Sequence, residues 1–152
     1  MKKIYTVFLL VFVVTVNTGQ TKNANYDSTL AKSLGADNFG MKSYVFVILK
    51  TGSYNPQEKE IRDSLFAGHM KNINRLVEEK KLIVAGPFGK NDLQYRGLFI
   101  LDAKDIEEAR ALVSTDPVVK ANIFDYDLIP WYGSAALPEY LKAADKIWKV
   151  NP

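Results

Sequence analysis

The sequence predicts an α+β domain in which one antiparallel sheet of four strands carries two helices on one face. Three observations lead to this fold class. Four short segments are dense in β-branched and aromatic residues, as strands are. Two further segments place apolar residues three or four positions apart, as amphipathic helices do. The segments follow one another in the order β-α-β-β-α-β, which is the split βαβ arrangement.

Length and composition indicate a single domain with an ordinary packed core. The 152 residues are 47% hydrophobic and 12% aromatic, enough for a packed core. The absence of cysteine excludes disulfides, cysteine nucleophiles, iron–sulfur centres and a lipid on an N-terminal cysteine. The sequence has a single histidine and no Asp-rich loop. We therefore predict no metal site and no cofactor.

The net charge argues against a nucleic-acid partner. The formal charge is +3, but Lys2 and Lys3 lie in a segment, residues 1–20, that contains no acid. Without them the charge is about +1 (3 minus 2), and the remaining cations are scattered among acids. Proteins that bind nucleic acid carry a clustered basic surface, which this pattern does not predict.

Residues 1–20 read as a signal peptide. A basic start is followed by about 13 apolar residues, a length that suits a secretory signal and is short for a membrane span. We expect export to the periplasm or the extracellular space, with no membrane span after cleavage; the alternative is an uncleaved anchor. Residues 21–41 are a polar lead-in, with a short helix that starts after Asp27 or Ser28 and stops at Gly35.

The domain itself spans residues 42–133 and starts with a strand over 42–50. This strand is apolar at nearly every position, which indicates burial on both faces. A central helix runs from about Gln57 to Lys80, with Pro56 in its first turn. The second strand covers 82–85 and breaks at Gly86-Pro87, and the third covers 95–101.

The second half repeats the alternation. A helix over 106–113 has Asp105 as its N-cap and stops before Pro117. Residues 118–120 form a connection, and the fourth strand covers 122–129 until Pro130-Trp131 ends it. The order of the six elements predicts a ferredoxin-like fold with both helices on the same face of the sheet.

The other face of the sheet needs a cover, because an apolar sheet face of this size is not left in water. We expect it to carry Tyr44, Phe46, Phe99 and Phe124 or their neighbours. Residues 134–152 form a C-terminal extension, in which 138–149 repeat apolar residues at helical spacing. Either this third amphipathic helix or a second copy of the chain covers the face, and the sequence does not choose between them.

His69 is the first candidate for chemistry. It falls in the apolar stripe of the central helix, four residues after Leu65 and four before Ile73, and so faces the core. A histidine in such a stripe is more often a satisfied core residue than a catalyst. Gly68 precedes it in mid-helix, where glycine costs about 0.5–1 kcal/mol relative to alanine. That cost indicates the close approach of a ligand or of a neighbouring strand.

Asp116 is the second candidate. It follows the second helix and precedes Pro117, so its plainer role is to cap the turn over 117–120. Two helices on one face can bring the end of one against the middle of the other, which makes a bond between Asp116 and His69 reasonable. Such a bond would fix one imidazole tautomer and leave the other nitrogen to move a proton.

Four further residues are candidates for lining a substrate pocket. Phe88 and Trp131 follow turns at strand ends, and Arg75 and Arg96 are cations that suit an anionic substrate. Their plainer roles are core or rim aromatics and solvated surface charges.

Several of these segments together resemble the YciI-like (YCII-related) domain family over roughly residues 42–133. The resemblance rests on the order and spacing of five motifs: 69–76 (HMKNINRL), 81–88 (KLIVAGPF), 96–100 (RGLFI), Glu107-Glu-Ala with 115–120 (TDPVVK), and 129–131 (IPW). It implies a dimeric α+β barrel in which two sheets pack face to face, and hence a homodimer. It also implies a histidine–aspartate pair in a cleft, at His69 and Asp116.

Two positions depart from the family pattern. The family usually has glycine between the central helix and the second strand, where this chain has Lys80 or Lys81. It usually has glycine after the Asp-Pro segment, where this chain has Ala121-Asn122. Asparagine tolerates a left-handed backbone, so the second change is mild, whereas the first leaves the end of the helix undefined.

Two functions remain open from the sequence. In the first, the protein is a cofactor-independent lyase- or isomerase-like enzyme on a small organic substrate, an aromatic acid or lactone, with His69 as general base or acid and Asp116 orienting it. In the second, it is a non-catalytic exported module, a dimer that binds a small molecule or another protein, and His69–Asp116 is a buried structural pair.

Overall fold

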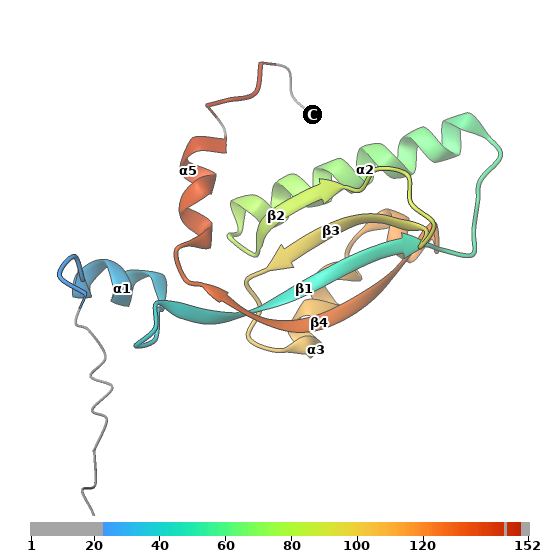
Figure 1. The fold of residues 1–152 in the computed structure, drawn as a ribbon. Coiled ribbons are helices and arrows are strands. Elements are labelled where there is room, and N and C mark those ends of the chain that lie inside the picture. The colour runs from blue at the N-terminus through green and yellow to red at the C-terminus, as the bar shows by residue number, and fades with distance from the viewer. Residues whose placement is uncertain (1–22, 145, 150–152) are drawn as a thin grey trace, which may run out of the picture.

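The computed structural model describes residues 23–144 and 146–149, and its centre is one four-stranded sheet (Figure 1). Neighbouring strands are antiparallel and follow the spatial order β2-β3-β1-β4. Their bounds are β1 Met41–Thr51, β2 Leu82–Pro87, β3 Tyr95–Leu101 and β4 Phe124–Ser134. The helices α2, Lys59–Glu78, and α3, Ile106–Val113, complete the β-α-β-β-α-β order, so the predicted α+β, ferredoxin-like fold is confirmed. The predicted signal peptide, residues 1–20, lies outside the described residues.

Two strands run past the prolines at which they were predicted to break, and both are edge strands. β2 includes Gly86 and Pro87, and β4 continues through Pro130 and Trp131 to Ser134, so the predicted breaks at both prolines are wrong. Proline lacks the N–H that a central strand needs, but an edge strand has one side without a partner strand. The sheet order leaves β2 and β4 at the edges. From sequence alone the two prolines could not be assigned to edges.

The helix ends largely follow the capping residues. Asp27 caps α1, Ser28–Leu34, and Gly35 ends it in the left-handed conformation, while Asp105 accepts a hydrogen bond at the start of α3, as predicted. α2 starts two residues later than expected, after Glu58. The predicted connection over 118–120 is instead a short helix, α4, Pro117–Lys120.

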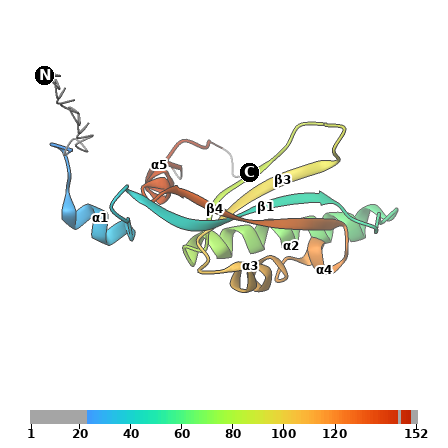
Figure 2. The ribbon, with the colours of Figure 1, turned by 60° about the horizontal axis from the view of Figure 1, so that its bottom comes forward.

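The main core lies between the sheet and the three helices α2, α3 and α4, all on one side of the sheet (Figure 2). Its buried members come from the inward positions of β1, β2 and β3, from the connection after β3, and from the apolar stripes of α2 and α3. They are Val45, Val47, Leu49, Leu76, Leu82, Phe99, Leu101, Ala103, Ala109 and Val113. Phe99 is buried on this helix side and Phe124 packs against the same cluster, so the prediction that they lie on the other face is wrong.

The other face is covered at one end by the chain's own C-terminal segment. Tyr44, Ile83 and Ile100 form a second buried cluster, against which Leu137 and Leu141 pack. The segment consists of a 3₁₀ turn, Leu137–Tyr140, and the short helix α5, Leu141–Ala144. α5 lies across the sheet from α2 (Figure 2). The predicted continuous helix over 138–149 is therefore wrong, since residues 146–149 are turn and irregular chain.

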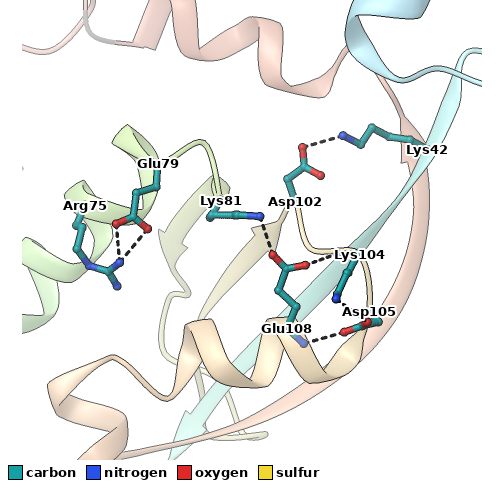
Figure 3. Close-up of polar contacts among 8 residues, drawn as sticks. All are labelled: Lys42, Arg75, Glu79, Lys81, Asp102, Lys104, Asp105 and Glu108. Carbon is teal, nitrogen blue, oxygen red and sulfur yellow. Dashed lines mark hydrogen bonds and ion pairs between the residues drawn. The ribbon is translucent and has the colours of Figure 1, made fainter.

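An ion pair joins the start of α3 to the connection between α2 and β2 (Figure 3). Lys81 Nζ donates to Glu108 Oε1 over 2.6 Å, and Glu108 Oε2 accepts from the backbone N–H of Lys104 over 2.9 Å. The hydrogen bond from Lys81 lowers the pKa of the Glu108 carboxyl below its usual range. The ion pair thus links the residue that precedes β2 to the first turn of α3. Across the described residues, helices long and apolar enough to cross a membrane are absent.

The end of α2 contains a strained lysine. Lys80 has φ +58°, its N–H donates to the Val77 carbonyl, and the N–H of Lys81 donates to the Leu76 carbonyl. This pattern is a Schellman motif, in which glycine is the preferred residue at the left-handed position. Asn122, with φ +56°, is also left-handed. Both departures from the family's glycines thus fall at positive φ.

We expect Lys80→Gly to stabilise the protein. A residue with a side chain pays about 1–2 kcal/mol for a left-handed backbone, and glycine does not. Glycine offsets about 0.5–1 kcal/mol of this gain, because it loses more conformational entropy on folding. The free energy of unfolding in urea should therefore rise by about 0.5–1 kcal/mol. Asn122→Gly is the matched control and should give a smaller gain, because asparagine tolerates this conformation. A Lys80→Gly protein no more stable than wild type would contradict the argument.

Candidate functional site

His69 lies in the third turn of α2, and its ring is enclosed by aromatic side chains. The residue is 8% exposed. The ring stacks on Phe99 with a centroid separation of 6.2 Å and an interplanar angle of 26°. The rings of Phe66 and Phe124 meet it edge-on at 6.1 and 5.8 Å. The apolar stripe that predicted a core-facing histidine is confirmed by this burial.

The Asp116 carboxylate is fully buried and meets the imidazole directly. His69 Nδ1 lies 2.6 Å from Asp116 Oδ2, and the other oxygen, Oδ1, accepts from the Val118 N–H over 3.1 Å. An ionised carboxylate only accepts hydrogen bonds, so Nδ1 carries the proton. Asp116 therefore has both roles that were considered from the sequence: it caps α4 and it is the partner of His69.

The approach of α4 to α2 explains the glycine beside the histidine. A Cβ built on Gly68 would lie 3.0 Å from Pro117 Cγ, closer than ordinary van der Waals contact. The neighbour that needs this space is therefore the Pro117 ring, not a strand. Because Pro117 follows Asp116 directly, the small residue at 68 lets the carboxylate reach the imidazole.

A polar network beside the pair fixes the turn that carries Asp116. The Thr115 hydroxyl lies 2.9 Å from the Asn72 side-chain oxygen and 2.6 Å from the Leu112 carbonyl. Arg75 Nη2 donates to both Asn72 Oδ1 and Thr115 Oγ1 over 2.8 and 2.9 Å. Arg75 thus joins α2 to the turn before α4, away from the pocket for which it was a candidate. Asn72 and Thr115 were missed, although Asn72 stands three residues after His69 on the same helical face.

The second imidazole nitrogen remains available. Nε2 makes no hydrogen bond to the described residues, and none of their buried side-chain nitrogens or oxygens lacks a partner. Nε2 is therefore reachable from solvent. An imidazole held as the Nδ1–H tautomer by a carboxylate presents a lone pair on Nε2, which is the arrangement of a general base.

A cavity of about 450 Å³ lies beyond the aromatic side chains that enclose this ring, and His69 itself is not among its lining residues. Two aromatic residues, Phe66 and Phe124, both line the cavity and contact the imidazole. Phe88 and Arg96, candidates from the sequence, line it as well. Sequence reasoning missed Arg62, which also lines it; its place one turn before Phe66 on α2 was the available signal.

Trp131 lies elsewhere. Its ring packs on Tyr44, with centroids 5.6 Å apart, and lies against the Cα of Gly133, where a Cβ would be 2.4 Å from the indole. Tyr44 belongs to the cluster on the sheet face opposite the helices. Trp131 is therefore separated from the cavity by the sheet. Within the part of the chain that the structure describes, no three His, Cys, Asp or Glu side chains are grouped closely enough to hold a metal ion.

Comparison with known proteins matches a family model, a sequence relative and a solved structure. The model of the YCII-related domain matches residues 45–132, more than half of the 152-residue chain. The uncharacterized protein YjpA of Bacillus subtilis (strain 168) is 26% identical over 91 residues, which are 60% of this chain and 95% of YjpA. A solved structure is also similar: the 5-chloro-2-hydroxyhydroquinone dehydrochlorinase TftG of Burkholderia phenoliruptrix AC1100, in complex with 2,5-dihydroxybenzoquinone. It is 26% identical, with a TM-score of 0.42 over 57% of this chain and 92% of that one.

We expect Asp116→Asn to reverse the imidazole tautomer. The Val118 N–H needs an oxygen acceptor, so the amide oxygen stays there and the NH₂ group faces His69 Nδ1. Nδ1 must then accept, and the proton moves to Nε2. The protein has one histidine, so ¹⁵N NMR of histidine-labelled protein at alkaline pH reads the tautomer without assignment.

The matched control for this prediction is Asp125→Asn, at an exposed carboxylate that pairs with Lys50. This variant should keep the wild-type tautomer. A wild-type spectrum with the proton on Nε2 would show that the carboxylate does not hold the ring as described.

Proposed function

Since the chain belongs to the YCII-related domain family, we propose that it is a small enzyme that moves a proton on a small organic substrate without a cofactor. The single observation that carries the proposal is the 2.6 Å bond between a fully buried carboxylate and an imidazole whose Nε2 has no hydrogen-bond partner among the described residues. An aromatic acid or a lactone is the substrate class that we propose.

The proposed mechanism uses both nitrogens of His69. Nε2 takes a proton from a substrate carbon next to a carbonyl group. The electron pair of the C–H bond forms a C=C bond while the π pair of the carbonyl moves to its oxygen, which gives an enolate. Asp116 stabilises the imidazolium that results, because its Oδ2 already accepts from Nδ1. In an isomerisation, the carbonyl re-forms and another substrate carbon takes the Nε2 proton. In an elimination, the carbonyl re-forms, the bond from the neighbouring carbon to a leaving group breaks, and the leaving group takes the Nε2 proton.

A second candidate function follows from the other hydrogen bond of Asp116. Because Oδ1 caps α4, the pair also has a structural role that does not require catalysis. In this reading the protein is a binding or interaction module, and breaking the pair costs stability alone. A buried hydrogen bond to a charged group contributes about 1.5–3 kcal/mol.

His69→Gln separates the two functions. We expect it to slow the exchange of substrate C–H with D₂O, followed by ¹H NMR over a panel of aromatic acids and lactones, by about 10²–10⁴-fold. Lys71→Gln, on the exposed side of α2, is the control and should leave the exchange rate unchanged. A His69→Gln protein that is less stable but exchanges protons at the wild-type rate would support the binding module instead.

We also propose that two copies of the chain pair through the sheet face opposite the helices. The C-terminal segment covers this face at the end that contains Tyr44 and Ile83. Towards the edge strand β4, Ile129 remains 45% exposed and Trp131 37% exposed. An apolar surface of this kind is typical of an association face.

The dimer is tested by analytical ultracentrifugation. Wild type should sediment as a dimer, and Ile129→Asp as a monomer, because a carboxylate cannot be buried in an apolar interface without a partner. Ile61→Asp is the matched control, since Ile61 is equally exposed, at 43%, but lies on α2. A monomeric wild type would refute the proposed pairing.

A further inference from the structure

We propose that the cavity beside His69 is a binding site for the carboxylate of a planar aromatic substrate, and that Arg62 and Arg96 are its specificity-determining residues. The inference rests on the proposed function, because it assigns the substrate's anchoring group within the same site. Its test is nevertheless independent of turnover.

The charge of the cavity is the first argument. Arg62 and Arg96 are its charged lining residues, and no carboxylate lines it. Two acids that adjoin lining residues have other partners: Asp63, next to Arg62, pairs with Lys59, and Asp125, next to Phe124, pairs with Lys50. Among the described residues neither arginine forms a salt bridge. The cavity therefore concentrates two positive charges, which attract an anion.

The second argument is the way in which Arg96 is held. Its Nε donates to Thr51 Oγ1 over 2.6 Å, and the Thr51 hydroxyl in turn donates to the Gln94 carbonyl over 3.2 Å. This anchor orients the guanidinium while using one of its five N–H groups. The remaining donors form the planar fork that binds a carboxylate through two parallel hydrogen bonds.

The third argument is the shape and polarity of the walls. Three phenylalanines line the cavity, at positions 66, 88 and 124. Phe88 and Tyr54, at the rim, are 39% and 43% exposed, which leaves large aromatic surfaces in water. Aromatic side chains pack well against a planar ring, by offset stacking or edge-to-face contact. A cavity with aromatic walls and two cations suits an aromatic acid better than a phosphate or an aliphatic acid.

The fourth argument is the order of residues along α2. Arg62, Phe66 and His69 are spaced i, i+4 and i+7, so they share one face of the helix. The rise of the helix places the first and the last about 10 Å apart along the axis. An arginine side chain and one substituted ring together span such a distance. The carboxylate would therefore lie towards Arg62 and Arg96, and the aromatic ring towards Phe66 and Phe124, which contact the imidazole.

The probes for the test are benzoate and benzamide, which have nearly the same shape but differ in charge. Titration calorimetry with wild type should give a dissociation constant for benzoate at least about tenfold below that for benzamide, as expected for hydrogen bonds to a charged group. Arg62→Gln and Arg96→Gln should each weaken benzoate binding by about tenfold and leave benzamide binding unchanged. Arg96→Lys should recover only part of the loss, because lysine lacks the fork.

The matched control is Arg110→Gln, at an exposed arginine on α3 outside the cavity, which should bind benzoate as wild type does. Equal affinities for benzoate and benzamide, or no benzoate binding at all, would overturn the proposal. So would an Arg62→Gln, Arg96→Gln double variant that is folded by circular dichroism and retains wild-type affinity.

A final variant distinguishes failure of this inference from failure of the proposed function. His69→Gln should still bind benzoate within about threefold of wild type, because the anion is held by the arginines. If it binds benzoate but wild type exchanges no substrate proton, the anion site stands and the catalytic role fails. If wild type exchanges protons on neutral lactones and ignores benzoate, the catalytic role stands and the anion site fails.

Discussion

The hydrogen bond between His69 and Asp116 is the interaction on which the helix side of this domain depends. It joins residues 47 positions apart in the chain and lies under the sheet, where water cannot solvate a carboxylate. A buried charge without partners would cost several kcal/mol, so the fold must place hydrogen-bond donors at both carboxylate oxygens. Asp116 meets this requirement with two bonds, one to the imidazole and one to the first turn of α4.

The surrounding residues position Asp116 for its hydrogen bond to His69. Gly68 has a low helix propensity, but its lack of a side chain lets the Pro117 ring approach α2. The Asn72, Arg75 and Thr115 network then holds the turn that precedes Asp116. The position of the carboxylate is thus set from both sides, by packing and by hydrogen bonds. A rigidly held pair is equally compatible with a catalytic and with a structural role. The hydrogen bond itself therefore does not distinguish the two functions, whereas proton transfer at Nε2 does.

The two faces of the sheet carry different groups of residues. The helix side holds the imidazole and, at one end, the aromatic cavity with Arg62 and Arg96. The opposite side holds a smaller apolar cluster, over which the C-terminal segment folds, and Tyr140 donates to the Ile83 carbonyl to fasten it. The association face and the ligand cavity that we propose therefore lie at separate parts of the sheet.

The sequence by itself determined the four strands, the two main helices, the caps at Asp27 and Asp105 and the inward direction of His69, because each follows from local periodicity and capping chemistry. It also made Asp116 the candidate partner. Tertiary structure decided the rest. Pro130 continues β4 because β4 is an edge strand, Trp131 lies across the sheet from the cavity, and Arg75 serves the turn before Asp116. Arg62 and Arg96 share a cavity only because α2 and the β2–β3 hairpin meet, and no local pattern encodes a meeting of segments more than thirty residues apart.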